Sequence, residues 1–163
     1  MRLYLLRHSE AEISGNISDS DRKLTSAGVE EAQAAAKAIA AMKLSFTVGL
    51  TSPMTRARQT MEIVTKQFQS LSVKSINQLS STADPKEFFA ELQALPRDSR
   101  VLVVSHEPFI SRCVGKLINA DEDPHLSIKK GTLVCVEVGS PVQRGAGVLL
   151  WVLTNEQMRL MFR

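Results

Sequence analysis

Cysteine is scarce in this sequence, and no apolar run is long enough to cross a membrane. Cys113 and Cys135 are the only cysteines, and neither belongs to a CxxC or CxxH spacing. We predict that both are small core residues rather than metal ligands, a disulfide or a nucleophile. The first apolar run, residues 3–6, ends at Arg7 and His8, far short of the roughly 20 residues of a spanning helix. It is also too short for a signal peptide, so we expect a buried strand and a cytoplasmic protein with no membrane partner.

The sequence also lacks the features of a nucleic-acid-binding protein. It contains one Tyr, one Trp and no run of Lys or Arg longer than two, although its formal charge is +3 and its pI is near 9.0. Proteins that bind nucleic acids usually combine dense basic clusters with aromatic stacking platforms. We therefore expect no nucleic-acid partner. The mild basic excess fits a small anionic substrate or an acidic protein partner at least as well.

What the sequence does contain is a regular alternation of apolar runs and helical patterns. Its 163 residues, without an internal repeat or linker, predict one domain over residues 1–163. Strands are predicted at residues 3–6, 48–51, 72–76, 101–104, 133–138 and 148–153, and helices at 25–42, 54–69, 85–95 and 108–118. Fully apolar strands separated by amphipathic helices indicate an α/β fold of three layers, α/β/α. We expect a mostly parallel central sheet, with an antiparallel edge formed by a final hairpin.

Chemically useful side chains follow three of these strands. The first strand is followed by Arg7, His8 and Ser9, the second by Ser52 and then Arg56, and the fourth by His106. Ligands of parallel α/β sheets bind beyond the carboxyl ends of the strands. These residues are therefore predicted to meet in one site.

The predicted site suits phosphoryl transfer. A neutral imidazole is a competent nucleophile toward phosphorus, and a second, protonated imidazole can stabilise charge on the transferred group. Arginine forks and helix N-termini bind phosphoryl oxygens. No His, Asp or Cys spacing indicates a metal ligand set, so we expect no metal and no cofactor.

Each of these residues also has a structural interpretation. Arg7 and His8 fit a salt-bridged pair, His106 fits a satisfied buried histidine, and Arg56 fits a solvated helix face. Their joint occurrence at three strand ends favours a site. We predict surface positions for Arg58 and His125.

Lys129 and Lys130 follow in the same polar loop as His125. They are predicted either to be solvated or to contact a partner.

Four motifs give the chain a specific resemblance. LYLLRHSEAE, RKLTSAGVEEA, SPMTRARQT and VVSHEP occur in the order and spacing of the histidine phosphatase superfamily, the phosphoglycerate-mutase-like enzymes. The chain is most similar to the small SixA-type branch of phosphohistidine phosphatases. Its length and the late segment KKGTLVCVEV agree with that branch. The resemblance covers nearly the whole chain and implies no large cap insertion.

The resemblance also implies residue roles. His8 resembles the family's nucleophile, which becomes phosphohistidine. Arg7 and Arg56 resemble its two phosphate-holding arginines, and His106 resembles its second catalytic histidine. Ser52 matches a position beside the pocket.

The sequence departs from the family at two places. Ser9 replaces the usual glycine, leaving a backbone N–H and adding a hydroxyl that either donates to phosphate or crowds it. The acidic proton donor of many family members has no clear counterpart, because Asp84 reads as a helix cap before Pro85, and Glu87 lacks the usual context. Glu10 and Glu12 are predicted to be solvated rather than to orient His8.

A missing acid favours a labile substrate. Alkoxide leaving groups need protonation, and general acid catalysis contributes roughly 100- to 10,000-fold. The P–N bond of phosphohistidine breaks more readily. We therefore expect a phosphohistidine phosphatase that acts on a phosphotransfer domain or phosphocarrier protein and releases phosphate. The alternatives are a small-molecule phosphomonoesterase of the same superfamily and a non-catalytic phosphoprotein-binding module.

Overall fold

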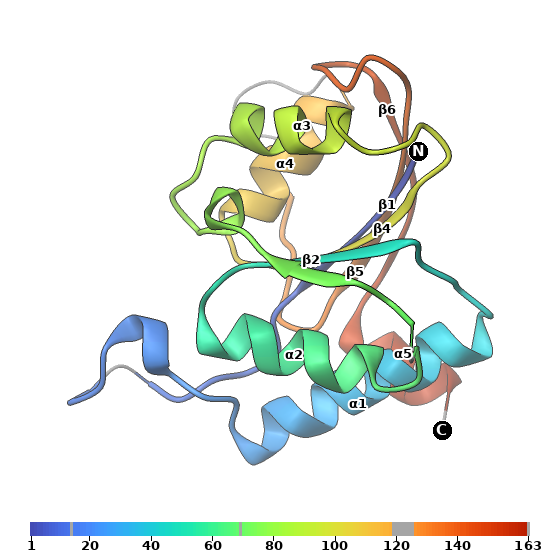
Figure 1. Ribbon diagram of the computed structural model, residues 1–163. Helices are drawn as coiled ribbons and strands as arrows, with labels where there is room; N and C mark the ends of the chain where they lie inside the picture. The colour runs from blue at the N-terminus through green and yellow to red at the C-terminus, as the bar shows by residue number, and fades with distance from the viewer. Residues whose placement is uncertain (14, 69, 119–125, 163) are drawn as a thin grey trace.

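The computed structural model describes residues 1–13, 15–68, 70–118 and 126–162. His125, predicted to lie on the surface, falls outside the described residues. The described elements form one six-stranded sheet with helices on both faces (Figure 1). The predicted three-layer α/β/α fold is therefore confirmed, and no inserted cap interrupts the part of the chain described here.

The sheet has the strand order β3-β2-β4-β1-β5-β6. Its strands are β1 (Arg2–Arg7), β2 (Val48–Thr51), β3 (Val73–Ser75), β4 (Arg100–Ser105), β5 (Leu133–Val138) and β6 (Gly147–Leu153). The first four strands in this order pair in parallel, whereas β5 is antiparallel to both β1 and β6. The carboxyl ends of β1, β2 and β4 therefore lie next to one another at one edge of the sheet.

The helices are α1 (Ser26–Ala41), α2 (Thr55–Thr65), α3 (Pro85–Gln93), α4 (Phe109–Leu117) and α5 (Asn155–Met161). Helices α3 and α4 cover one face of the sheet, and α1, α2 and α5 cover the other (Figure 1). Side chains alternate along β1 accordingly: Leu3 and Leu5 pack with α3 and α4, whereas Tyr4 and Leu6 pack on the opposite face. Burial of both faces explains why the inner strands are continuously apolar.

Two helical regions differ from the sequence-based prediction. Helix α2 ends at Thr65 rather than at residue 69. Helix α5 was not predicted, although a capping box marks its start: Thr154 accepts a hydrogen bond from the Gln157 backbone, and the Gln157 side chain accepts one from Thr154. A helix of seven residues has too short an apolar pattern to be recognised by periodicity.

The segment that follows β1 is pinned against the start of α1. The Thr25 side chain caps α1 by accepting a hydrogen bond from the Gly28 backbone N–H, and it donates one to the Glu10 carboxylate. A Cβ on Gly28 would lie 1.9 Å from the Glu10 carbonyl oxygen, so only glycine permits this approach. Glu12 accepts from the Lys23 backbone N–H. The prediction that Glu10 and Glu12 are merely solvated is therefore wrong, and both carboxylates brace the loop beyond His8.

Both cysteines are buried and unbonded, as predicted. Burial raises the pKa of the Cys135 thiol to about 11 and that of Cys113 still further, so both are protonated at neutral pH. Among the described helices, none has the length and apolar character needed to cross a bilayer.

Candidate active site

Side chains from the ends of β1, β2 and β4 meet in a buried group, which we call the strand-end cluster: His8, Ser52, Arg56 and His106. The rings of His8 and His106 lie 4.9 Å apart between centroids. Arg56 Nε donates to His8 Nε2 across 3.3 Å, and Ser52 Oγ lies 2.7 Å from His106 Nε2. The structure thus brings together four residues that are separated by up to 98 positions in the sequence.

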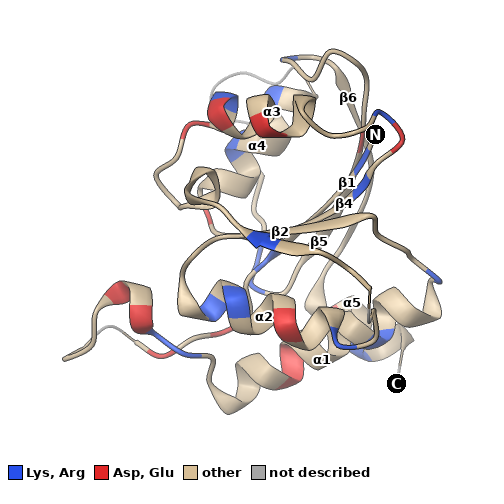
Figure 2. Cartoon of the chain, in the orientation of Figure 1, with Lys and Arg blue, Asp and Glu red and all other residues tan. Residues whose placement is uncertain are grey.

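The backbone holds these residues at the sheet edge. The His8 N–H donates to the Ser105 carbonyl, and the Ser52 N–H donates to the Val104 carbonyl. Each bond continues the parallel ladder one residue beyond the strand. Arg56 lies in the first turn of α2, where Figure 2 shows basic residues along the ribbon. Sheet register and helix start together determine the geometry of the cluster.

His8 is neutral, and its lone pair lies on Nε2. Nδ1 lies 2.7 Å from the Ser9 carbonyl oxygen, which can only accept, so Nδ1 carries the proton. The pKa of His8 is lowered to about 3, chiefly by burial and to a lesser degree by His106, Arg56 and Arg7, while the hydrogen bond to the Ser9 carbonyl opposes the shift. The Nε2 atom is therefore unprotonated at neutral pH, as a nucleophile requires.

His106 is also neutral. Burial, followed by the charge of Arg56, lowers the pKa of His106 to about 4. The sequence analysis expected a protonated second imidazole, whereas burial of this ring favours its neutral form. A dianion placed beside the ring would raise its pKa again.

Arg56 connects the cluster to an acidic loop. Its guanidinium is 5% exposed, yet Nη2 lies 3.1 Å from the Asp19 carboxylate and Nη1 donates to the Asp19 carbonyl. Hydrogen bonds from Arg22 and Arg56 lower the pKa of Asp19. Acidic residues colour this projecting loop in Figure 2. Sequence analysis did not identify Asp19, because nothing in its local pattern shows a contact with a helix 37 residues away.

Arg7 is oriented differently from the other predicted site residues. Its Nη1 donates to the Ile128 carbonyl across 2.8 Å, and its Nε is buried without a partner among the described residues. Burial lowers the pKa of Arg7, while the nearby carboxylates of Glu107 and Glu31 oppose the shift. The charge of Arg7 reaches His8 and His106 electrostatically, but its side chain lines a separate cavity.

Ser9 is completely buried beside His8. Its backbone N–H donates to the Thr60 hydroxyl across 3.2 Å, so this N–H is already engaged. Its own hydroxyl oxygen has no partner within the described structure. Of the Ser9 backbone N–H and the Ser9 hydroxyl, only the hydroxyl is therefore available to bind phosphate among the described contacts.

The carboxylates considered as acids lie away from the cluster. Asp84 caps α3 by accepting from the Lys86 N–H, as predicted, and pairs with Lys116. Glu87 is exposed on α3, and Arg58 is exposed on α2, as predicted. Sequence analysis missed Glu107, which follows His106 directly. Ser111 donates to it, and burial raises its pKa.

Buried polar atoms without partners gather at this end of the sheet. Within the described structure, they belong to Arg7, Ser9, His106, Glu107 and Thr132. Each such atom costs about 1–3 kcal/mol relative to a hydrogen-bonded one. Their concentration around one buried cationic cluster is typical of a site that completes its hydrogen bonds on binding a ligand. No group of three or more His, Cys, Asp or Glu in the described ranges is arranged to hold a metal ion.

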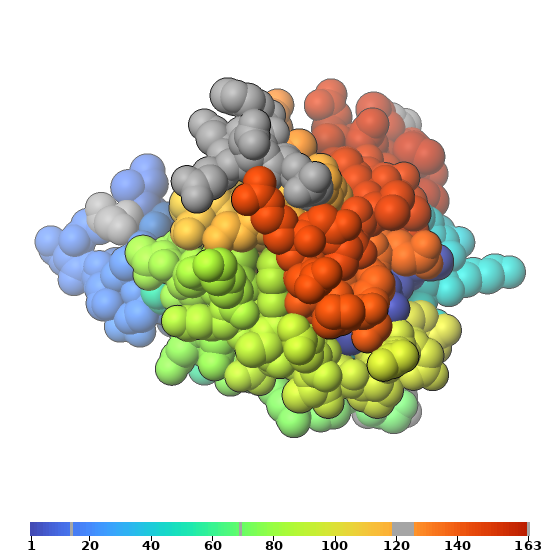
Figure 3. Space-filling model, turned by 90° about the horizontal axis from the view of Figure 1, so that it is seen from above, coloured from blue at the N-terminus to red at the C-terminus, as the bar shows by residue number. Residues whose placement is uncertain are grey.

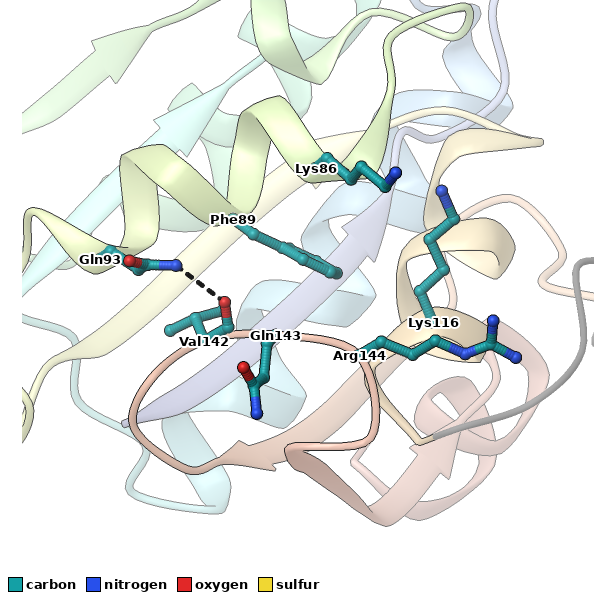
Figure 4. Close-up of a pocket in the computed structure, with 7 residues that line it drawn as sticks. All are labelled: Lys86, Phe89, Gln93, Lys116, Val142, Gln143 and Arg144. Atoms are coloured by element: carbon teal, nitrogen blue, oxygen red, sulfur yellow. Dashed lines mark hydrogen bonds between the residues drawn. The ribbon is translucent and has the colours of Figure 1, made fainter.

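A further cavity, of about 390 Å³, lies away from the cluster, between α3, α4 and the loop that joins β5 to β6. Figure 3 shows that loop beside α3 on one face of the molecule. In Figure 4 the Phe89 ring forms the floor, and the side chains of Lys86, Lys116 and Arg144 gather at one side. Lys116 is paired with Asp84, so this cavity offers no convergent catalytic groups.

Comparisons with known proteins agree with the geometry. The model of the histidine phosphatase superfamily (branch 1) matches residues 3–82. The phosphohistidine phosphatase SixA of Escherichia coli is 28% identical over 163 residues, covering 98% of each chain. The solved structure of the protein histidine phosphatase SixA complexed with tungstate has a TM-score of 0.85 and 27% identity, covering 97% of this chain and 99% of that one.

The fold also occurs in proteins with other substrates. A putative alpha-ribazole-5'-P phosphatase from Escherichia coli has a TM-score of 0.77 at 20% identity, covering 95% of this chain and 97% of that one. This likeness concerns the fold alone. The architecture by itself therefore does not define the phosphorylated substrate.

Proposed function

Because this chain belongs to the histidine phosphatase superfamily, we propose that it removes the phosphoryl group from a phosphohistidine on a protein. The substrate is a phosphotransfer domain or phosphocarrier protein of the cytoplasm, and the product is inorganic phosphate. One observation carries the proposal: the neutral His8 ring has its Nε2 lone pair next to Arg56, and a second imidazole lies close by. The ring centroids of His8 and His106 are 4.9 Å apart.

The reaction proceeds in two displacements. His8 Nε2 attacks phosphorus, the P–N bond of the substrate breaks, and its electron pair goes to the leaving imidazole, which takes up a proton. The resulting phospho-His8 ring carries positive charge, which the Ser9 carbonyl stabilises through Nδ1–H. Water then attacks phosphorus, the bond to Nε2 breaks, and phosphate leaves.

The cationic residues stabilise the transferring group. Arg56 and Arg7 supply positive charge for the phosphoryl oxygens, and His106 supplies a ring nitrogen on the same side. In this proposal, the Nδ1–H of His106 and the Oγ–H of Ser9, which have no partner within the described structure, donate to the bound phosphoryl oxygens. Ser52 positions the His106 ring through Nε2.

The central test is trapping of the phosphoenzyme. Incubation of the wild type with a phosphohistidine protein, followed by rapid quenching, is expected to give an acid-labile phosphoenzyme. His8→Ala is expected to form none and to lose at least about 10,000-fold in kcat. Arg58→Ala, which changes an exposed residue of α2, serves as the control and is expected to keep full activity. Full turnover by His8→Ala would overturn the mechanism.

A second candidate function, hydrolysis of small phosphomonoesters, is favoured by Glu107. Burial raises the pKa of this carboxyl next to His106, as a proton donor to an alkoxide requires. Glu107→Gln separates the two functions. It is expected to abolish any activity on sugar or nucleotide phosphates and to leave hydrolysis of free phosphohistidine within about threefold of the wild type. Efficient, Glu107-dependent cleavage of esters with no activity on phosphohistidine would favour the second candidate.

A further inference from the structure

A large open cavity adjoins Arg7. Its volume is about 770 Å³, and it lies between the segment that precedes β5 and helix α5. We call it the basic cavity, and its lining includes Arg7, Glu31, Lys129, Lys130, Asn155, Glu156 and Arg159. Among the cavities that the structure shows, this one shares a residue with the proposed catalytic machinery.

The lysines of the basic cavity are held rigidly beside Arg7. The Gly131 N–H donates to the Arg7 carbonyl, and the Thr132 N–H donates to the Lys129 carbonyl. The Arg7 N–H in turn donates to the Thr132 carbonyl, and the Arg7 side chain donates to Ile128. Because this turn is bonded to both the backbone and the side chain of Arg7, the backbone that carries the two lysines has a fixed position relative to Arg7.

The opposite wall of the basic cavity is equally fixed. Asn155, the first residue of α5, donates through its side chain to the Glu31 carbonyl of α1. The same side chain packs on Gly131, where φ is +67° and a Cβ would lie 2.8 Å from Asn155 Nδ2. The cavity therefore exists before any partner binds, which lowers the cost of ordering its surface on binding.

The charge of the basic cavity is positive and partly uncompensated. Its lining carries four cationic side chains, Arg7, Lys129, Lys130 and Arg159, against two carboxylates, Glu31 and Glu156. Arg159 is paired with Glu30, and the Glu31 carboxylate accepts from the Glu10 N–H. The side chains of Lys129 and Lys130 make no hydrogen bond or ion pair with the described part of the chain. Two unpaired ammonium groups thus stand next to a candidate catalytic arginine. Helices α1 and α5 close the cavity behind them.

We propose that the basic cavity docks an acidic segment of the substrate protein, next to its phosphohistidine. The inference rests on the proposed function and extends it, because it names the surface that recognises the protein. A phosphohistidine inserted at the strand-end cluster lies close to Arg7, so carboxylates flanking it reach Lys129 and Lys130. Complementary charge at such a rim raises the rate of association and orients the partner.

The shape and lining of the cavity favour a polypeptide over a nucleic acid. None of the described residues that line it is aromatic, although single-stranded nucleic acids are usually held by aromatic stacking. Leu160 and the Thr154 side chain offer an apolar and a polar contact beside the charges. A protein segment with carboxylates on one side can use all of these contacts.

The test compares two phosphohistidine peptides of equal length. They are identical except that aspartates flank the phosphohistidine in one and asparagines in the other. At low ionic strength, the kcat/KM of the wild type for the aspartate peptide is expected to be about tenfold higher than its kcat/KM for the asparagine peptide. Lys129→Glu/Lys130→Glu is expected to remove this preference. The same variant is expected to hydrolyse free phosphohistidine within twofold of the wild type.

A matched double variant controls for net charge. Lys66→Glu/Lys86→Glu changes two exposed lysines outside the basic cavity by the same total charge and is expected to keep the preference. Lys129→Gln/Lys130→Gln removes the two charges without reversing them, so it is less disruptive to the fold. It is expected to show a preference for the acidic peptide between those of the wild type and the Glu variant. Equal hydrolysis of the two peptides by the wild type would overturn the inference. So would an equal loss of preference in Lys129→Glu/Lys130→Glu and in Lys66→Glu/Lys86→Glu.

Binding separates this inference from the proposed function. Fluorescence anisotropy of the unphosphorylated acidic peptide is expected to show weaker binding to Lys129→Glu/Lys130→Glu than to the wild type. If the wild type hydrolyses no phosphohistidine but this difference persists, the docking surface stands and the proposed function fails. Tighter binding of an oligonucleotide than of the acidic peptide would overturn the assignment to a protein.

Discussion

The strand-end cluster and the basic cavity are both positively charged, but they differ in burial. His8, Arg56 and His106 are 7%, 5% and 2% exposed, whereas Lys129 is exposed and Lys130 is half-buried. Burial determines protonation in the cluster: the pKa of His8 falls to about 3 and that of His106 to about 4. The cavity keeps its charges in water, where they act over a distance and are screened by salt.

This difference separates chemistry from recognition. A nucleophilic imidazole must be neutral and correctly oriented, and both properties require a low-dielectric environment with fixed hydrogen bonds. Attraction of a charged partner requires cations that remain accessible. Arg7 joins the two regions, because it influences both imidazoles and also lines the cavity.

The largest expected effect concerns the buried arginine. Lysine cannot reproduce the contacts of Arg56 with His8 and Asp19, because it lacks the planar fork. Arg56→Lys is expected to lower kcat/KM about 100- to 1,000-fold in a steady-state assay with phosphohistidine. Arg58→Lys, on the exposed side of the same helix, is expected to stay within twofold. Equal effects of the two substitutions would remove the distinction between buried and exposed cations.

The second prediction concerns stability below neutral pH. The folded-state pKa values of His8 and His106, about 3 and about 4, lie below the reference value of 6.5. The unfolded chain therefore takes up protons first as the pH falls through 6.5. The corresponding stability is complete above that pH and is lost on acidification, by about 2 kcal/mol per histidine between pH 7 and pH 5.

Urea unfolding at the two pH values measures this loss. The double variant His8→Gln/His106→Gln provides the reference for all other titrating groups. It is expected to lose clearly less stability between pH 7 and pH 5 than the wild type. An identical pH dependence in both proteins would show that the imidazoles are not held neutral by burial.

The third prediction concerns the Asp19 carboxylate, which forms an ion pair with Nη2 of Arg56. An anion that binds to Arg56 competes with this carboxylate and is repelled by its charge. Asp19→Asn is therefore expected to tighten binding of inorganic phosphate about three- to tenfold in calorimetric titration. Asp21→Asn, in the same short 3-10 helix, is the control and is expected to change binding by less than twofold. Weaker binding by Asp19→Asn would instead identify Asp19 as a support that positions Arg56.

The smallest expected effect concerns ionic strength. Raising the salt concentration from 0.05 to 0.3 M is expected to lower kcat/KM for an acidic phosphohistidine protein by a few-fold, because exposed charges are screened. Hydrolysis of free phosphohistidine at the buried cluster is expected to change little over the same range. Parallel salt dependence for both substrates would contradict the division of labour between the two regions.

Much of this organisation was predictable from local sequence. Continuous apolar runs located β1 and β4, and the residues that follow β1, β2 and β4 supplied the cluster. The cap residue Asp84 was recognisable because a cap bonds within three residues along the chain. Helix α5 was missed for the opposite reason: it is short, and its docking on α1 through Asn155 is a long-range contact.

Other features could be seen only in the folded chain. Asp19 reaches Arg56, the Ser9 N–H is taken by Thr60, and Arg7 turns toward the basic cavity. None of these contacts follows a periodic pattern. The sequence analysis included Glu107 in the VVSHEP motif but gave it no role. Its raised pKa results from burial, which exists only in the folded chain.

The sequence by itself determined which residues can serve at the site, because the period of the apolar pattern and the ends of the strands are local properties. The tertiary structure decided their chemical state. Protonation, tautomer and accessibility depend on burial and on charges from distant segments, and these exist only after β1, β2, β4 and α2 have come together.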